Sequence, residues 1–163
     1  MSAARSRVSA GLLLYRRRTA SPLEVLIAFP GGPYFARKDE GSWTIPKGEY
    51  EPDEEALAAA YREFAEEIGT PPPDGERIDL GSIIQKGGKV VRAWAVEGDL
   101  DTSTVVSNEF EIEWPPRSGR RERFPEIARA EWVSPDAARR KLKPTQIPFV
   151  DRLEAALADA GRA

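Results

Sequence analysis

The sequence predicts a mixed α/β sandwich. Three observations support this fold class: strand-like apolar runs lie on both sides of one amphipathic helical segment, a second amphipathic segment closes the chain, and no internal repeat divides it. Of the 163 residues, 40% are hydrophobic and 31% are charged, which is typical of a soluble domain. We therefore expect one domain that covers residues 1–163.

Residues 8–16 and 23–29 are predicted to form the first two strands, with a turn over residues 17–22 between them. The N-terminus has a basic start and a short apolar run, but it lacks the longer apolar region and the cleavage site of a signal peptide. No stretch has the length of a membrane span. We expect a cytoplasmic protein that does not associate with a membrane.

Residues 43–49 are predicted to be a short strand that leads into a helix. Asp53 is the expected N-cap, Glu54 and Glu55 would occupy the first turn, and Gly69 would end the helix. Apolar residues at spacings of three and four form one stripe that would face a core: Leu57, Ala60, Tyr61, Phe64 and Ile68.

Beyond the helix, residues 70–76 are predicted to be a stiff turn, and strands over 78–85 and 89–96 would form a hairpin through residues 86–88. Trp94 would lie in the core or in a pocket wall. Residues 97–128 are predicted to be irregular, with a possible short strand at 110–114. A last strand over 129–133 would precede helices over 134–142 and 145–160, the second with Phe149, Leu153, Ala156 and Leu157 on one face.

Negative charge is concentrated in the central helix and the residues before it. Residues 49–69 contain eight acids and one base, whereas the whole chain has a net charge of only −3. On a helix, Glu63, Glu66 and Glu67 fall within an arc of roughly 100° beside the apolar stripe, where they repel one another. Converging carboxylates are what a hard divalent cation such as Mg²⁺ or Mn²⁺ requires, and the alternative is a solvated acidic face.

The chain has no histidine and no cysteine. Their absence excludes a Ser-His-Asp triad, imidazole or thiolate metal ligands, a cysteine nucleophile and disulfides. Any catalysis must therefore depend on carboxylates, lysine, tyrosine or a metal ion.

Residues 48–70 resemble the Nudix box, the motif G-x5-E-x7-R-E-U-x-E-E-x-G-U in which U is a bulky aliphatic residue. All charged and glycine positions match, and the two departures, an aromatic residue at position 64 and a threonine at position 70, are packing positions. The matching residues are Gly48, Glu54, Arg62, Glu63, Glu66, Glu67 and Gly69. The resemblance implies a mixed sheet between helices, an α/β/α sandwich, with the box as loop, helix and loop.

The resemblance also implies a metal site for Mg²⁺ or Mn²⁺. By it, Glu63, Glu66 and Glu67 would bind the metal, and the backbone carbonyl of Lys47 would join them. Glu54 and Arg62 would support these ligands, Arg62 as the ion-pair partner that orients a metal-binding glutamate. One of the box acids or a loop acid would be the general base. Glu126 is a candidate extra ligand, and its rivals are Glu109, Glu111 and Glu113.

Residues 30–42 form a loop rich in glycine and proline that contains candidate substrate-binding residues. It would be either a lip over the active site, with aromatic side chains for a nucleobase and basic ones for phosphates, or a surface loop whose aromatic residues pack into the core. The candidates are Tyr34, Phe35, Arg37 and Lys38, and the side chain of Lys47 could also contact a phosphate.

A second basic segment contains Arg117, Arg120, Arg121 and Arg123. It could contact phosphates, but a solvated loop is the simpler interpretation, and we expect no nucleic-acid binding by this acidic protein. We leave the oligomeric state open.

The resemblance implies metal-dependent hydrolysis of a pyrophosphate bond in a nucleoside diphosphate linked to another moiety. The Pro-Lys-Gly sequence at residues 46–48 is similar to that of family members that act on dinucleoside polyphosphates and inositol pyrophosphates, although family markers for particular substrates are missing at residues 85–88. We expect a nucleoside triphosphate or a dinucleoside polyphosphate as the substrate. The alternatives are a non-catalytic Nudix-like module that senses a nucleotide or binds a partner, and a purely structural acidic helix in another α/β domain.

Overall fold

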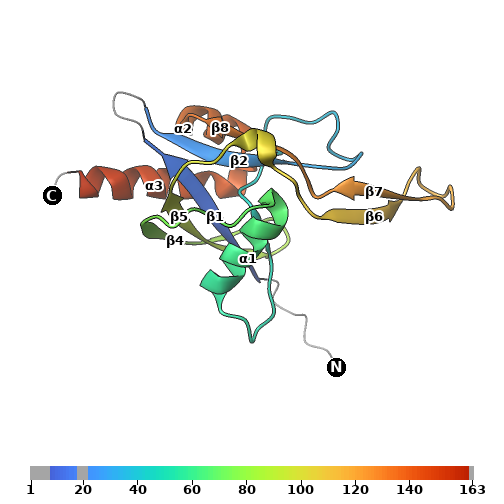
Figure 1. Cartoon of the computed structure of the whole chain (residues 1–163), viewed down its shortest axis with the longest axis horizontal. Helices are drawn as coiled ribbons and strands as arrows, with labels where there is room; N and C mark the ends of the chain where they lie inside the picture. The colour runs from blue at the N-terminus through green and yellow to red at the C-terminus, as the bar shows by residue number, and fades with distance from the viewer. Residues whose placement is uncertain (1–7, 18–21, 162–163) are drawn as a thin grey trace.

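The computed structural model describes residues 8–17 and 22–161, and it contains a mixed sheet (Figure 1). The strand order is β4-β5-β1-β2-β8, and β3 also pairs with β1. β1 and β5 are parallel, while the other pairs are antiparallel. The strands are β1 (Val8–Arg16), β2 (Glu24–Pro30), β3 (Lys47–Glu49), β4 (Arg77–Ile84), β5 (Val90–Glu97) and β8 (Ile127–Val133).

Helices cover both faces of this sheet, as the sandwich prediction requires. Helix α1 (Ala56–Ile68) packs on one face, and α2 (Pro135–Lys141) and α3 (Ile147–Ala160) pack on the other. Strand β1 alternates between the two cores: Leu12 contributes to the core under α1, and Leu13 contributes to the core under α3. The two cores hold α1 and α3 at fixed positions relative to β1 and β3.

Most strand predictions are confirmed to within one or two residues. The turn of residues 86–88 forms the expected hairpin, closed by hydrogen bonds from Gln85 N to Lys89 O (2.6 Å) and from Gly88 N to Gln85 O (3.0 Å). Trp94 is buried in the core under α1. The turn predicted over residues 17–22 lies mostly outside the described residues. Residues 43–49 form a strand only from Lys47 onward, since Trp43 and Thr44 make isolated bridges to Leu142 and Ala28.

The predicted start of the central helix is wrong. Glu55 is the N-cap and Ala56 is the first helical residue, so neither Glu54 nor Glu55 lies in the first turn. A turn closed by the hydrogen bond from Glu54 N to Glu51 O (2.9 Å) occupies the position where Asp53 was expected to cap the helix. The predicted end is confirmed, because Gly69 adopts the left-handed conformation with φ 94°.

The apolar stripe of α1 faces the core as predicted. The closing helix also packs with the expected face, and Phe149, Leu153 and Leu157 are buried while Ala156 is partly buried. It begins two residues later than predicted because residues 144–146 form a 3₁₀ turn that starts with a proline.

The prediction of an irregular segment over residues 97–128 is only partly correct: the possible short strand at residues 110–114 is confirmed as β6 (Glu109–Glu113), whereas a second strand, β7 (Arg121–Pro125), was not expected. Strands β6 and β7 form an antiparallel hairpin that projects from the main sheet (Figure 1). The pairing places Glu111 against Arg121 (2.9 Å), and the rings of Phe110 and Phe124 lie 6.1 Å apart. Each strand alone has the composition of a solvated loop, and its partner supplies the complementary charges.

Within the described residues, none of the helices is long and apolar enough to cross a membrane.

Candidate active site

Strand β3 and helix α1 meet at Gly48. A Cβ atom at this position would lie 1.7 Å from Glu63 Oε1, so only glycine allows the Glu63 side chain to approach the strand this closely. Lys47, the residue before Gly48 in the strand, provides a second contact, since its N–H donates a hydrogen bond to Glu67 Oε1 (3.3 Å). These contacts hold two predicted metal ligands against β3.

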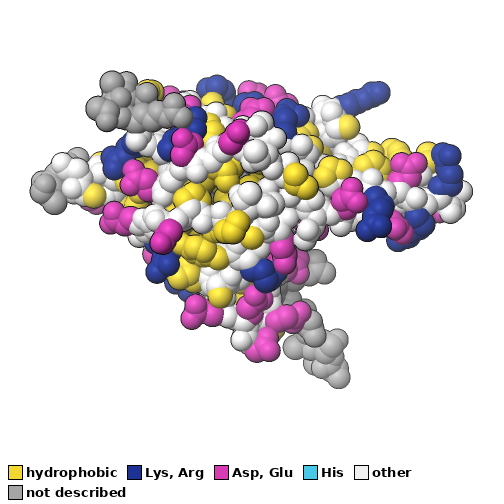
Figure 2. Space-filling model, viewed as in Figure 1, with side chains coloured by type: hydrophobic (Ala, Val, Ile, Leu, Met, Phe, Trp, Pro, Cys, Tyr) yellow, Lys and Arg dark blue, Asp and Glu magenta, His cyan; other side chains and the backbone are white. Residues whose placement is uncertain are grey.

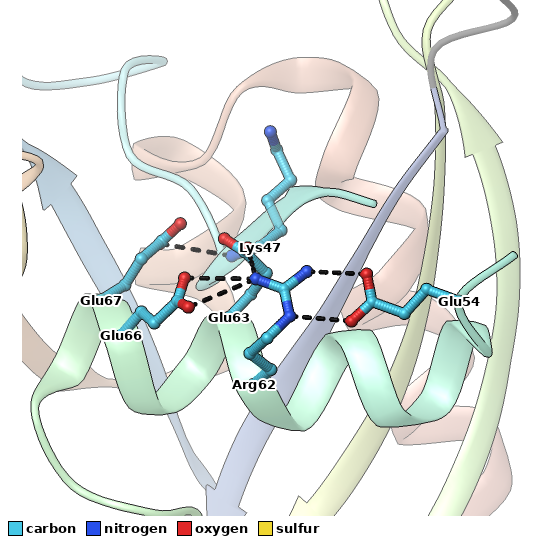
Figure 3. Close-up of polar contacts among 6 residues, drawn as sticks. All are labelled: Lys47, Glu54, Arg62, Glu63, Glu66 and Glu67. Carbon is cyan, nitrogen blue, oxygen red and sulfur yellow. Dashed lines mark hydrogen bonds and ion pairs between the residues drawn. The ribbon is translucent and has the colours of Figure 1, made fainter. Parts of the chain in front are cut away.

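Arg62 connects the acidic side chains along α1 (Figure 3). Its guanidinium makes a bidentate ion pair with Glu54, with distances of 2.8 and 3.0 Å. The same group contacts Glu63 at 2.5 Å and Glu66 at 3.3 Å. The predicted ion pair between Arg62 and a metal-binding glutamate is therefore present, and Glu54 anchors Arg62 from the side of the helix N-terminus.

Glu67 is the most buried of these acids, with only 7% of its surface exposed. Burial raises its pKa to about 8, and the nearby charge of Glu63 adds to the rise. Burial also raises the pKa of Glu63, an effect that its ion pair with Arg62 opposes. A cation bound beside these carboxylates would favour their ionised forms.

Glu126 lies close to the same acids. Burial raises its pKa, the charge of Glu66 contributes to this rise, and Glu126 in turn raises the pKa of Glu63 and Glu67. Its rivals lie elsewhere: Glu109 and Glu111 pair with arginines of β7, and Glu113 accepts a hydrogen bond from Gly119 N at the tip of the hairpin. Of these candidates for an additional ligand, Glu126 is the one that lies close to Glu63 and Glu67.

A chain of main-chain hydrogen bonds fixes the position of Glu126. Asn108 N donates to Glu66 O (3.0 Å), Glu126 N donates to Asn108 O (2.8 Å), and Gly31 N donates to Glu126 O (2.9 Å). The chain joins α1, both ends of the β6–β7 hairpin and the loop after β2. Sequence reasoning missed Asn108 because main-chain pairing between distant segments leaves no local pattern.

The predicted convergence of the three box acids is incomplete. Over residues 8–17 and 22–161, no three acidic side chains are grouped so that they could already hold a metal ion. The carboxylates of Glu63 and Glu66 turn towards Arg62, while Glu67 turns towards β3 (Figure 3).

The candidate substrate-binding residues of the loop after β2 differ in their exposure. Tyr34 is 62% exposed and contacts the ring of Trp114 at the hairpin tip, with ring centroids 5.3 Å apart. Phe35 packs against the core under α3, with Lys38 over its ring, and Arg37 is exposed. Phe35 thus follows the core alternative, whereas Tyr34 extends towards the hairpin.

Replacing Arg62 with lysine should reduce kcat about ten- to a hundredfold. Lysine keeps the positive charge but cannot hold Glu54 with two parallel bonds while it also contacts Glu63. Steady-state kinetics and thermal melting of Arg62→Lys would check this. An unchanged kcat in Arg62→Lys would show that the positive charge alone, rather than the bidentate geometry, supports the site.

Comparisons with known proteins identify the fold and the family of this chain. The family model for the NUDIX domain matches residues 5–153. A search of curated proteins found no match. A solved Ap4A hydrolase from C. elegans, in a binary complex, is 22% identical with a TM-score of 0.65, over 93% of this chain and 98% of that one.

Two further solved structures share the fold. The NUDIX domain of NrtR from Shewanella oneidensis, in complex with ADP ribose, is 14% identical with a TM-score of 0.61, over 92% of this chain and 87% of that one. The MutT protein from Methanosarcina mazei Go1 is 19% identical with a TM-score of 0.58, over 92% and 94% of the two chains. At these identities the structures show likeness of fold alone. The domain match over most of the chain, together with the sandwich fold, shows that this chain belongs to the Nudix family.

Proposed function

We propose that this protein hydrolyses a pyrophosphate bond in a nucleoside diphosphate linked to another moiety, in a reaction that depends on a divalent metal ion. The observation that carries the proposal is the group of acids at the junction of β3 and α1, where the buried Glu67 and the partly buried Glu63 lie close to Glu126. Membership in the Nudix family supports pyrophosphate hydrolysis in general. A nucleoside triphosphate or dinucleoside polyphosphate is the substrate that we favour.

The acids at this junction fit a hard cation. Glu67 has no basic side chain bonded to its carboxylate among the described residues, and it lies beside Glu63 and Glu126, so its ionised form lacks a bonded counter-charge that a cation would supply. We propose Glu63, Glu66, Glu67, Glu126 and the carbonyl of Lys47 as the ligands of Mg²⁺ or Mn²⁺, all of which offer oxygen donors. The chemistry that the bound ion supplies is positive charge at the phosphates and acidification of water.

The protein side chains would position the ligands and accept a proton. Arg62, held by Glu54, fixes the carboxylates of Glu63 and Glu66 along the helix. The attacking water would transfer its proton to one of the four acids at the junction. Burial of Glu67 and Glu63 excludes bulk water from these groups and strengthens each electrostatic contact.

The loop after β2 would contact the substrate away from the scissile bond. Tyr34 presents an exposed ring beside Trp114, which suits stacking with a nucleobase, and Arg37 and Lys38 present exposed cations for phosphates.

We further propose that residues 1–163 form one domain, which the domain match over residues 5–153 supports. A cytoplasmic location stays a prediction.

A substrate panel would test the proposed function. Purified protein with Mg²⁺ or Mn²⁺ would be assayed against nucleoside triphosphates, diadenosine polyphosphates, ADP-ribose, nucleotide sugars and an inositol pyrophosphate, and EDTA-treated protein would be the control. We expect turnover of a nucleoside triphosphate or a dinucleoside polyphosphate that EDTA abolishes. Nucleotide binding without turnover of any compound would instead indicate a sensing module.

Metal binding should release a proton below about pH 8. A carboxylate must be ionised to bind a metal, and the pKa of about 8 keeps Glu67 largely protonated at pH 7 in the metal-free protein. The apparent affinity for Mg²⁺ should therefore rise by up to about tenfold per pH unit and level off above pH 8. Calorimetric titration at pH 6.5 and pH 9, in buffers that differ in ionisation enthalpy, would measure the released proton.

The same raised pKa determines how the stability of the metal-free protein changes with pH. The unfolded chain loses the Glu67 proton near the ordinary pKa of 4.5, whereas the folded protein retains it until about pH 8. The contribution of Glu67 to the free energy of unfolding should therefore fall as pH rises through this interval.

In the calorimetric titration, equal proton release at pH 6.5 and pH 9 would contradict the proposal that Glu67 is protonated in the metal-free protein and loses its proton when it binds the metal.

A further inference from the structure

A buried amide side chain lies in the 3₁₀ turn just before α3. Gln146 has 0% of its surface exposed, and its Oε1 accepts a hydrogen bond from Ile45 N (2.9 Å). Its Nε2 donates to Thr44 Oγ1 (2.9 Å) and to Gln85 Oε1 (3.0 Å). These hydrogen bonds compensate for the burial of a polar group, and they connect the start of α3 to the segment before β3 and to the turn after β4.

The segment that leads into β3 has a different main-chain partner at each successive residue. Thr44 exchanges two hydrogen bonds with β2 (2.8 and 2.9 Å), and Pro46 O accepts one from Leu12 N of β1 (3.1 Å). Between them, Ile45 N is bonded to the side chain of Gln146. Gln146 therefore takes the place of a neighbouring strand at Ile45.

The main chain of Lys47 is directed away from β1. In the antiparallel pairing of β3 with β1, Pro46 O on one side of Lys47 and Tyr50 N on the other bond to β1. Because alternate residues of such a pair bond to the partner strand, the N–H and C=O of Lys47 point to the opposite edge. There the N–H donates to Glu67 Oε1 (Figure 3), so the carbonyl that we propose as a metal ligand lies on the edge that contacts Glu67.

The connection between Ile45 and Lys47 is stiff. The proline at position 46 fixes its own φ and restricts Ile45, the residue before it, to an extended conformation. Strand β1 also contacts the segment closely, since a Cβ atom at Gly11 would lie 2.6 Å from Pro46 O and 2.7 Å from Lys47 Cβ. A displacement of Ile45 would therefore be passed on to Lys47 instead of being absorbed between them.

We propose that Gln146 is a positioning residue of the active site, which holds Ile45 and thereby sets the position of the Lys47 main chain beside Glu67. Gln146 acts through the backbone of residues 45–47. An apolar side chain could fill the same buried position, but it would leave Ile45 N without its acceptor. This inference rests on the proposed function for the role of the Lys47 carbonyl as a metal ligand.

Calorimetric titration of the full-length protein with Mn²⁺ would test this role. Gln146→Leu should weaken Mn²⁺ binding about tenfold, because the loss of groups that orient metal ligands has effects of this size. The matched control is Val150→Ala, which removes a fully buried apolar side chain one turn further along in α3. This control should lower the melting temperature but leave the Mn²⁺ affinity within about twofold.

A milder pair of variants decides the question if Gln146→Leu does not fold. Thr44→Val removes the hydroxyl group that accepts the hydrogen bond from Gln146 Nε2, whereas Thr44→Ser keeps a hydroxyl group at this position. The Mn²⁺ affinity should fall in Thr44→Val and be retained in Thr44→Ser.

Amide hydrogen exchange in EDTA provides a measurement that needs neither metal nor hydrolysis. In Gln146→Leu, Lys47 N–H should exchange faster relative to Leu13 N–H, which lies in the buried core of β1. The ratio of the two rates removes the effect of global stability, so it should be unchanged in Val150→Ala. A purely structural role of Gln146 would not change this ratio.

For a protein that binds Mn²⁺, unchanged affinity in Gln146→Leu or an equal loss in Val150→Ala would overturn the positioning role, whatever the substrate panel shows. If the unmodified protein binds no Mn²⁺, the proposed function is refuted. In that case faster relative exchange of Lys47 N–H in Gln146→Leu would uphold the positioning of Lys47, and an unchanged ratio would overturn it.

Discussion

Glu67→Gln should reduce kcat on the order of a thousandfold and leave the fold intact. Glutamine keeps the size of the side chain and an oxygen that can still accept the hydrogen bond from Lys47 N. It removes the negative charge at the most buried acid of the site, and metal-derived charge stabilisation contributes several kcal/mol to such reactions. Steady-state kinetics with saturating Mg²⁺ would measure the loss.

The control for this variant is Glu55→Gln. Glu55 is an exposed acid at the start of the same helix, and its side chain makes no capping hydrogen bond. Its replacement should leave kcat within about twofold, because substitutions of exposed side chains that make no specific contact usually have small effects. Glu67→Gln should also melt no lower than the unmodified protein in EDTA at pH 7, since the pKa of about 8 makes Glu67 largely neutral there and glutamine is a neutral group of the same size. Retained activity in Glu67→Gln would remove Glu67 from the metal site.

Gly48→Ala should reduce kcat about a hundredfold with little change in melting temperature. The added Cβ atom would lie 1.7 Å from Glu63 Oε1 and 2.1 Å from Glu63 Cδ, so the Glu63 carboxylate must move. The atoms that must move belong to the end of a flexible side chain, and the backbone of β3 can stay in place. A displacement of about 1 Å in a catalytic group can cost about a hundredfold in rate.

Gly161→Ala is the matched glycine control. Gly161 has a negative φ of −70°, and the nearest atom to an added Cβ is 3.4 Å away, at the far end of α3. This variant should retain full activity. If Gly48→Ala also retained full activity, the close approach of Glu63 to β3 would have no catalytic role. If Gly48→Ala instead failed to fold, its melting curve would separate that outcome from a loss of catalysis.

Features that depend on local periodicity could be predicted from the sequence. The stripe that includes Phe64 and Ile68 repeats at helical spacing, and the structure buries it as expected. The turn at residues 86–88 contains two glycines with positive φ, which is the conformation that such turns require. The ion pair between Arg62 and Glu63 follows from the motif itself.

Features that depend on pairing between distant segments could not be predicted. Strand β7 has three charged residues in five, and its partner strand β6 balances the arginines with Glu109 and Glu111. Gln146 bonds to Ile45 N and to the side chain of Gln85, and the three residues are far apart in the sequence. The helix start was misplaced because Glu54 bonds to Arg62, and so a turn replaces the expected cap.

The hairpin in Figure 2 projects from the body of the protein, and its surface contains both charged and apolar side chains. The main-chain bonds at its base, from Glu66 through Asn108 and Glu126 to Gly31, use groups that every residue except proline possesses. Its tip, residues 115–120, lies at the opposite end of both strands. Insertions or substitutions at the tip would therefore leave the main-chain bonds that position Glu126 unchanged. The tip can vary in length and sequence independently of the acids at the junction of β3 and α1.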